Sequence, residues 1–248
     1  MGWPGHAPYE LAPEAGKRLH WLRRRLLSWF ARNGRSLLWR EPDRTPYEVV
    51  VAEVLLQRTT AVGVARAYSG FIEHFPSWTS LSQAPLECLE SALRPLGLWR
   101  QKTLAFQSLA QSIEANGGAI PRTRTELERL RGIGPYTASA VLAIVYGRAE
   151  PLLDVNMARL LVRFLGSSEG AEASPKRTLH PLALRLVRGK RSLEANWAAL
   201  DCLPCQASTV PRASAADQVP VCQVAQAPTY SQRRCSFRLT KRCWPMMM

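Results

Sequence analysis

The sequence predicts an all-α fold, because three observations along the 248-residue chain agree. Apolar residues recur at helical spacing in segment after segment, whereas the alternation typical of strands is almost absent. Proline and glycine interrupt these segments at the intervals expected of loops between helices. Apolar residues make up 46% of the chain, which is an ordinary share for a globular protein with a buried core.

The predicted helices follow one another with short connections. The first is amphipathic and ends at Asn33-Gly34, and Thr45 or Pro46 opens the second. Further helices are predicted at 61–75, 85–94, 99–116, 124–130, 136–147, 154–165, 175–188 and 192–201. Beyond residue 201 the apolar periodicity is lost and Ala, Pro, Ser and Gln dominate. Residues 202–248 are therefore predicted to be loop or disorder unless a metal organises them.

The charge of the chain points to a polyanionic partner. There are 33 Lys and Arg against 19 Asp and Glu, a formal net charge of +14, and nucleic acid is the first candidate for such an excess. A basic surface that serves only solubility is the alternative. No secretory signal and no run of apolar residues long enough to cross a bilayer is seen, so we expect a soluble cytoplasmic protein without a membrane partner.

Residues 130–144 read LRGIGPYTASAVLAI, a Gly-x-Gly corner that leads directly into an apolar helix. Gly132 and Gly134 allow backbone angles closed to other residues and let a ligand approach the main chain. The amide groups at the start of the helix favour an anion, and a DNA phosphate fits the charge of the chain. An ordinary turn between two packed helices is the alternative interpretation.

Together with the preceding helix, this corner resembles a helix–hairpin–helix element of the form L-x-G-[IV]-G-x-x-T-A. Asp154 follows Tyr136 by eighteen residues in PLLDVNMARLLVRFLG. The segments at 33–60 (NGRSLLWRE through LLQRTT) and 75–90 (FPSWTSLSQAPLECLE) also match in order and spacing. Over roughly residues 20–201 the chain is similar to the helix–hairpin–helix DNA glycosylase superfamily, which includes endonuclease III and the adenine and T/G-mismatch glycosylases.

The resemblance implies a two-lobed all-α fold with a DNA-binding cleft between the lobes. A helical barrel with the hairpin is expected over 46–150, and a second lobe with the catalytic aspartate over 151–201. The N-terminal helix within 1–45 is expected to pack on that second lobe. Residues 202–248 would then be a degenerate iron–sulfur-like or disordered tail.

Hydrolysis of an N-glycosidic bond requires protonation of the departing base and stabilisation of positive charge on the sugar. The resemblance assigns charge stabilisation to Asp154 and base protonation to Glu53, which lies in the apolar run VVVAEVLLQ where burial would raise its pKa. Asn156 is expected to orient the aspartate or the sugar. The structural alternatives are a helix N-cap for Asp154, a surface ion pair for Glu53 and a helix-start hydrogen bond for Asn156.

Tyr136 lies where bifunctional relatives carry a lysine. Without an amine at this position no Schiff base to the sugar forms readily. The resemblance therefore implies a monofunctional DNA N-glycosylase of base excision repair with little or no strand-cleaving lyase activity.

The resemblance also implies which residues contact DNA. Expected contacts are the hairpin residues Gly132, Ile133, Gly134 and Thr137, the wedge loop Gln57-Arg58-Thr59, and Leu98 on a second loop. Arg58 replaces a glutamine and Leu98-Trp99 replaces a Tyr-Tyr pair of the adenine glycosylases, and both changes lean towards the T/G-mismatch branch.

The leading substrate is adenine opposite guanine or oxidised guanine in double-stranded DNA. Thymine or uracil opposite guanine is the alternative substrate, and a non-catalytic DNA-binding module is the alternative class. We expect the protein to be a monomer.

Many relatives hold a [4Fe–4S] cluster on the pattern C-x6-C-x2-C-x5-C. Here the tail carries Cys202, Cys205, Cys222, Cys235 and Cys243, with 2, 16, 12 and 7 residues between them. Cys205 and Cys222 approximate the outer spacing, but the inner pair is missing. The sequence therefore predicts an incomplete metal site, with a shifted reading frame in the tail as an open explanation.

Overall fold

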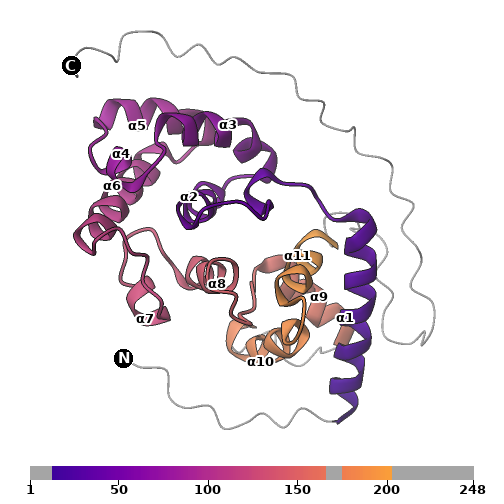
Figure 1. The fold of residues 1–248 in the computed structure, drawn as a ribbon. Helices are drawn as coiled ribbons and strands as arrows, with labels where there is room; N and C mark the ends of the chain where they lie inside the picture. The colour runs from indigo at the N-terminus through magenta and orange to yellow at the C-terminus, as the bar shows by residue number, and fades with distance from the viewer. Residues whose placement is uncertain (1–12, 166–174, 203–248) are drawn as a thin grey trace. The chain divides into compact units, whose positions relative to one another are not determined.

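The computed structural model describes residues 13–165 and 175–202 of the chain (Figure 1). Every regular element in these ranges is helical and none is a strand, which confirms the all-α prediction. The α-helices are α1 (Pro13–Asn33), α2 (Pro46–Leu56), α3 (Ala61–His74), α4 (Trp78–Ser82), α5 (Leu86–Leu93), α6 (Trp99–Ala115), α7 (Arg124–Leu127), α8 (Pro135–Ile144), α9 (Val155–Leu165), α10 (Pro175–Val187) and α11 (Ser192–Cys202), with 3₁₀ turns η1 (Leu38–Arg40) and η2 (Arg94–Leu96). No described helix has an apolar stretch of the length needed to traverse a lipid bilayer.

Two elements differ from the sequence prediction. Helix α4 was not expected, because its five residues are too few to show a period, although Ser77 and Ser80 cap its start in a reciprocal hydrogen-bonded pair. The helix expected at 124–130 has only the four residues of α7, after which single turns lead to the glycine corner. Both differences concern short segments in which capping, rather than periodicity, decides the structure.

The chain forms two compact units, which are described separately. Within the described residues, unit 1 comprises the chain up to Ser36 and from Leu142 onward, and unit 2 comprises Leu37–Val141. The boundaries thus lie nine residues before those expected at 45/46 and 150/151. The first boundary is set by side-chain contacts on either side of it. Arg35 forms an ion pair with Asp201 of unit 1. Trp39 is buried in unit 2 against Tyr68, with 5.7 Å between the ring centroids.

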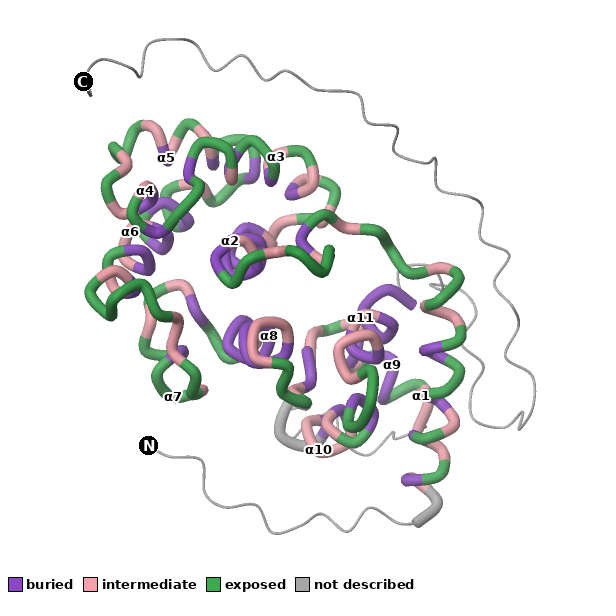
Figure 2. Tube along the Cα trace, viewed as in Figure 1, coloured by how far each residue is buried: buried purple, intermediate pink, exposed green. Residues whose placement is uncertain are grey.

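Unit 1 is built around α1, which packs against α10 and α11. The core combines leucines of α1 with Met157 and Leu161 of α9 and with the alanines of α11. Alanine side chains let the helices approach closely, and α11 is buried from Ala195 to Cys202 except at Trp197 (Figure 2). The N-terminal helix therefore shares its core with the helix that follows Asp154.

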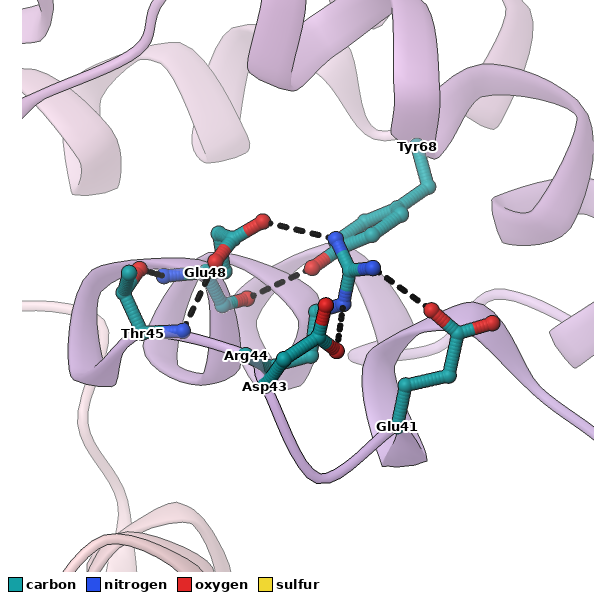
Figure 3. Close-up of polar contacts among 6 residues, drawn as sticks. All are labelled: Glu41, Asp43, Arg44, Thr45, Glu48 and Tyr68. Atoms are coloured by element: carbon teal, nitrogen blue, oxygen red, sulfur yellow. Dashed lines mark hydrogen bonds and ion pairs between the residues drawn. The ribbon is translucent and has the colours of Figure 1, made fainter.

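Unit 2 is organised around α2, which is buried from Tyr47 to Leu55 except at Glu48 (Figure 2). Its N-terminus is held by a capping box, in which Thr45 and Glu48 exchange side-chain-to-backbone hydrogen bonds. Around this cap, the Arg44 guanidinium pairs with Glu41, Asp43 and Glu48, and the Tyr68 hydroxyl donates to the Glu48 carbonyl (Figure 3). The start of the central helix is thus fixed by interactions on several sides.

Candidate active site and DNA-binding hairpin

Glu53 lies in the middle of α2, and only 8% of the residue is exposed. Its neighbours along the helix are valines, leucine and alanine, all buried. Burial raises the pKa of Glu53 to about 7, and the nearby charge of Arg40 opposes that rise. A carboxyl group that titrates near neutral pH can donate a proton where an ordinary glutamate would already be ionised.

Asp154 directly precedes α9. Its Oδ1 accepts the backbone N–H of Met157 at 2.8 Å, as an N-cap does, so the structure includes the capping role that the sequence left open. Burial raises the pKa of Asp154, and hydrogen bonds from Met157 and from the backbone and side chain of Asn156 oppose the rise. Asn156 is thus in contact with the aspartate, and its hydrogen bond favours the anionic form.

The extended segment before Asp154 is held by Asn196 of α11, a residue that sequence reasoning missed. The Asn196 side chain is fully buried; its Oδ1 accepts the N–H of Leu152 at 2.8 Å and its Nδ2 donates to the Glu150 carbonyl at 2.9 Å. These two bonds fix the path of the chain immediately before the catalytic candidate. The available signal was an asparagine between an alanine and a tryptophan in the run ANWAAL at 195–200.

The structure explains why glycine is needed at position 132 of the corner, but packing does not require it at position 134. Gly132 has φ +88°, and a Cβ there would lie 3.0 Å from the Cβ of Ala105, so both backbone conformation and packing favour glycine. At Gly134 a Cβ would meet no atom within 4 Å, so packing does not require glycine there. Within the described part of the chain the exposed Gly134 amide donates to no protein acceptor, which suits a site open to an anion.

Ile133 and Thr137, both expected to contact DNA, have buried side chains. The Thr137 Oγ1 accepts a hydrogen bond from Gln57 Nε2 at 3.1 Å, and the same nitrogen donates to the Gly132 carbonyl at 2.7 Å. Gln57, at the end of α2, therefore directs its amide nitrogen into the protein and holds the corner in place. The backbone N–H of Ile133 also donates within the protein, to the Leu130 carbonyl at 3.1 Å, so neither the side chain of Ile133 nor its amide is open to a ligand.

Two turns beside α2 present exposed side chains in an unusual backbone conformation. Arg58 has φ +55° and Leu98 has φ +50°, in the left-handed region that side-chain-bearing residues seldom occupy. Both residues are exposed, Leu98 to 42%. Thr59 joins the two turns, because its Oγ1 donates to the Leu96 carbonyl at 3.3 Å. The wedge-loop residue Arg58 and the second-loop residue Leu98 thus belong to one connected element of unit 2.

Tyr136 is the second residue of α8 and is half-buried. The position that would decide between hydrolysis and a lyase step therefore lies in the first turn of the hairpin's second helix. A phenol at this position supplies no amine for a Schiff base.

Charge is unevenly divided between the two units. Within the described residues, unit 1 carries sixteen Lys and Arg against five Asp and Glu, and unit 2 carries eleven against ten. Electrostatic attraction of a polyanion would thus come mainly from the unit that contains Asp154.

Of the five tail cysteines, Cys202 alone lies in the described part of the chain. Cys202 ends α11 and is buried, and Cys205 and Cys222 lie outside the described residues, together with Cys235 and Cys243. Among residues 13–165 and 175–202 no group of three or more His, Cys, Asp or Glu could hold a metal ion. With the inner pair also missing from the sequence, no step of the chemistry is assigned to a cluster.

Comparison with known proteins agrees with this geometry. The profile of the HhH-GPD superfamily base excision DNA repair proteins matches residues 51–183. A thymine-DNA glycosylase of Aeropyrum pernix is 41% identical over 151 residues, which cover 60% of this chain and 67% of the relative. A thymine/uracil-DNA glycosylase of Pyrobaculum aerophilum is 33% identical, covering 71% and 78% of the two chains. The human adenine DNA glycosylase is also 33% identical, but the chain spans about a third of its length, 34%.

Solved structures give the same result. A thermostable thymine-DNA glycosylase superposes with a TM-score of 0.70 at 27% identity, covering 75% of this chain and 85% of that one. Endonuclease III in a non-covalent DNA complex, at 24% identity and a TM-score of 0.63, shares the fold. Because the family profile covers more than half of the chain, and because relatives above 30% identity are matched over most of their length, the protein belongs to the HhH-GPD superfamily and is a DNA glycosylase of that family.

Proposed function

We propose that the protein is a monofunctional glycosylase that hydrolyses the N-glycosidic bond of a mispaired base opposite guanine in duplex DNA, and that this base is thymine or uracil. The observation that carries the reaction type is Glu53, a carboxyl group with a pKa near neutrality inside an apolar helix. A buried acid of this kind fits proton donation to a departing base.

The two carboxyl groups would divide the work. The bond between C1′ of the sugar and the base nitrogen breaks, and the base leaves with the bonding electrons and a proton. Water supplies hydroxide to C1′, and its remaining proton passes to solvent, from which the Glu53 carboxylate is protonated again. Asp154, with hydrogen bonds from Met157 and Asn156 that favour its anion, stabilises the positive charge on the sugar. Glu53 donates the proton to the base. Tyr136 offers no amine, so the reaction ends at the abasic site.

Three observations favour a pyrimidine as the base. The relatives matched over two thirds or more of their own length are named for thymine or uracil. Arg58 stands at the position expected for the wedge, and Leu98 followed by Trp99 stands where the adenine glycosylases have a Tyr-Tyr pair; both residue choices lean towards the mismatch branch. Adenine is the second candidate, because a purine needs a proton to leave and because the adenine glycosylases are also relatives.

The mode of DNA engagement follows from the hairpin and the charge. The exposed Gly134 amide at the start of α8 would receive a phosphate, and the basic surface of unit 1 would attract the duplex. We propose that the protein works as a monomer on chromosomal DNA in the cytoplasm.

The test is base release from four duplexes that carry T/G, U/G, A/G or A/oxidised-G pairs. Wild-type protein should release thymine or uracil, and Asp154→Asn should lose about a thousandfold or more in rate while retaining DNA binding. Asparagine is as good an N-cap as aspartate, so the variant should melt close to the wild type. Release of adenine alone would favour the second candidate. Tight binding without release from any duplex would leave a non-catalytic DNA-binding module.

A further inference from the structure

Lys102 is a buried cation at the end of the helix that carries Glu53. It lies in the first turn of α6, and 5% of the residue is exposed. Its Nζ donates to the carbonyls of Val54 at 3.1 Å, Leu55 at 2.9 Å and Gln57 at 2.8 Å. All three donor positions of the ammonium group are thus used on the C-terminus of α2, where helix carbonyls lack partners and the helix dipole favours a positive charge.

The third of these bonds reaches beyond the helix cap. Gln57 accepts from Lys102 through its backbone carbonyl, and its side chain donates to the Gly132 carbonyl and to Thr137 of the hairpin. One residue therefore connects the lysine to the glycine corner. A displacement of the Gln57 backbone would move the group that holds the corner.

The same lysine supports the two exposed turns. The Gln57 carbonyl precedes Arg58, and the N–H of Lys102 itself donates to the Leu98 carbonyl at 3.0 Å. Thr59, whose Oγ1 also approaches the Gln57 carbonyl, links the turns through Leu96. The left-handed conformations of Arg58 and Leu98 are unfavourable by themselves and persist only where the surroundings determine them.

We propose that Lys102 is a positioning residue for base extrusion: its ammonium group fixes the Gln57–Thr59 turn, and thereby presents the exposed Arg58 and Leu98 side chains as one preformed element that displaces the target base. This inference rests on the proposed function, because a wedge is needed only if a base must leave the duplex. Lys102 itself touches neither the base nor the sugar in this role.

An apolar side chain at position 102 would remove the cost of burying a charge, but it would leave the Val54, Leu55 and Gln57 carbonyls without the ammonium donor. Burial lowers the pKa of Lys102 to about 8, which shows that the cation is held against an unfavourable environment. A methionine would occupy a similar volume without a charge to desolvate. What methionine cannot supply is the simultaneous hold on the helix end and on the turn that follows it.

The experiment compares wild-type protein with Lys102→Met, the milder Lys102→Gln, and Leu109→Ala as a control. Leu109 is fully buried on the same helix but makes none of these contacts, so its truncation destabilises without touching the turns. Single-turnover base release is measured at saturating protein, where the rate does not depend on the folded fraction. Extrusion is followed by the fluorescence of 2-aminopurine beside the mismatch, and affinity is measured on a duplex with a tetrahydrofuran abasic-site analogue, in which no base has to be displaced.

Lys102→Met should lose on the order of a hundredfold in single-turnover rate, as expected for a small misplacement of a positioning element. It should also lose the fluorescence change, while its affinity for the abasic duplex changes less than about threefold. Lys102→Gln, which retains two N–H donors, should fall between Met and wild type. Leu109→Ala should show the wild-type rate and fluorescence change.

Three results would overturn the proposal. These are an unchanged rate in both Lys102 variants, a rate loss with normal extrusion, or an equal rate loss in Leu109→Ala. If Lys102→Met does not fold, the same criteria apply to Lys102→Gln. Failure of the proposed function looks different, because the wild type itself would then release no base from any duplex.

Discussion

Replacing Glu53 by glutamine should abolish proton donation and, at alkaline pH, stabilise the protein. The carboxyl group is buried, and no hydrogen bond or ion pair to its side chain occurs among the described residues. Its ionised form is therefore poorly compensated in the folded state. Glutamine has nearly the same volume and carries no charge, so it removes that unfavourable term together with the acid.

The size of the effect follows from the pKa. Folding raises the pKa of Glu53 from 4.5 to about 7, so the folded state holds the proton between these values while the unfolded state releases it. Stability from this group is present below pH 4.5 and is lost as the pH rises through 7. Between pH 5 and pH 8 the wild type should lose about 2 to 3 kcal/mol of unfolding free energy relative to Glu53→Gln. The base-release rate should fall about tenfold between pH 6 and pH 8 as the acid form is depleted.

The assay is urea unfolding of both proteins at pH 5 and pH 8, with Glu48→Gln as the matched control on the same helix. Burial acts to raise the pKa of Glu48, but hydrogen bonds from Thr45 and Arg44 outweigh it and hold that pKa below its usual value. Stability from Glu48 is lost only as the pH falls below about 4.5, so the difference between Glu48→Gln and the wild type should be nearly the same at pH 5 and at pH 8. If Glu53→Gln gains no stability relative to the wild type between pH 5 and pH 8, Glu53 is not a buried acid with a raised pKa.

Three further predictions concern the hairpin and the unit boundary. Tyr136→Lys should form a covalent DNA adduct on borohydride treatment and wild type should not, because only the amine forms a Schiff base; an adduct in wild-type protein would contradict monofunctional chemistry. Gly132→Ala should lower the melting temperature, because Gly132 has φ +88°. Gly134→Ala should melt as the wild type does and bind duplex DNA about fivefold more weakly. Equal melting temperatures of the two variants in a calorimetric scan would show that the two glycines do not differ in this way. Arg35→Met should lose about 2 kcal/mol of unfolding free energy in urea, because the fully buried Asp201 carboxylate loses the guanidinium that donates to it. An unchanged urea midpoint would show that this ion pair contributes nothing to stability.

Local patterns predicted the parts of the fold that depend on local chemistry. The long helices follow from apolar periodicity, and α2 begins where Thr45 and Pro46 predicted it, because capping and proline geometry involve only neighbouring residues. The glycine corner was visible for the same reason. Helix α4 was missed because five residues show no period.

The side-chain contacts that the sequence did not predict all join distant segments of the chain. In the sequence Lys102 is one more basic residue of an amphipathic helix, and nothing in its neighbours indicates that its ammonium group donates to two carbonyls of α2 and to that of Gln57. The inward direction of the Gln57 amide depends on Gly132, 75 positions away. Asn196 reaches Leu152 across 44 positions. A single sequence identifies such residue types, but their partners are set by how the helices pack.

Glu53 is the exception, because its sequence context alone indicated that a charged residue is unfavourable at this position. A glutamate within VVVAEVLL opposes the burial that its neighbours require, and the structure supplies no partner from the described residues to offset it. Arg40 lowers the pKa only in part, so the residue weakens the fold at neutral pH. A structural role would favour glutamine or leucine at this position, since either removes the charge. Proton donation requires a group that its surroundings keep protonated and hold in a fixed position. Glu53 meets both requirements, because it is buried in the centre of a helix whose ends are fixed by the Thr45 cap and by Lys102.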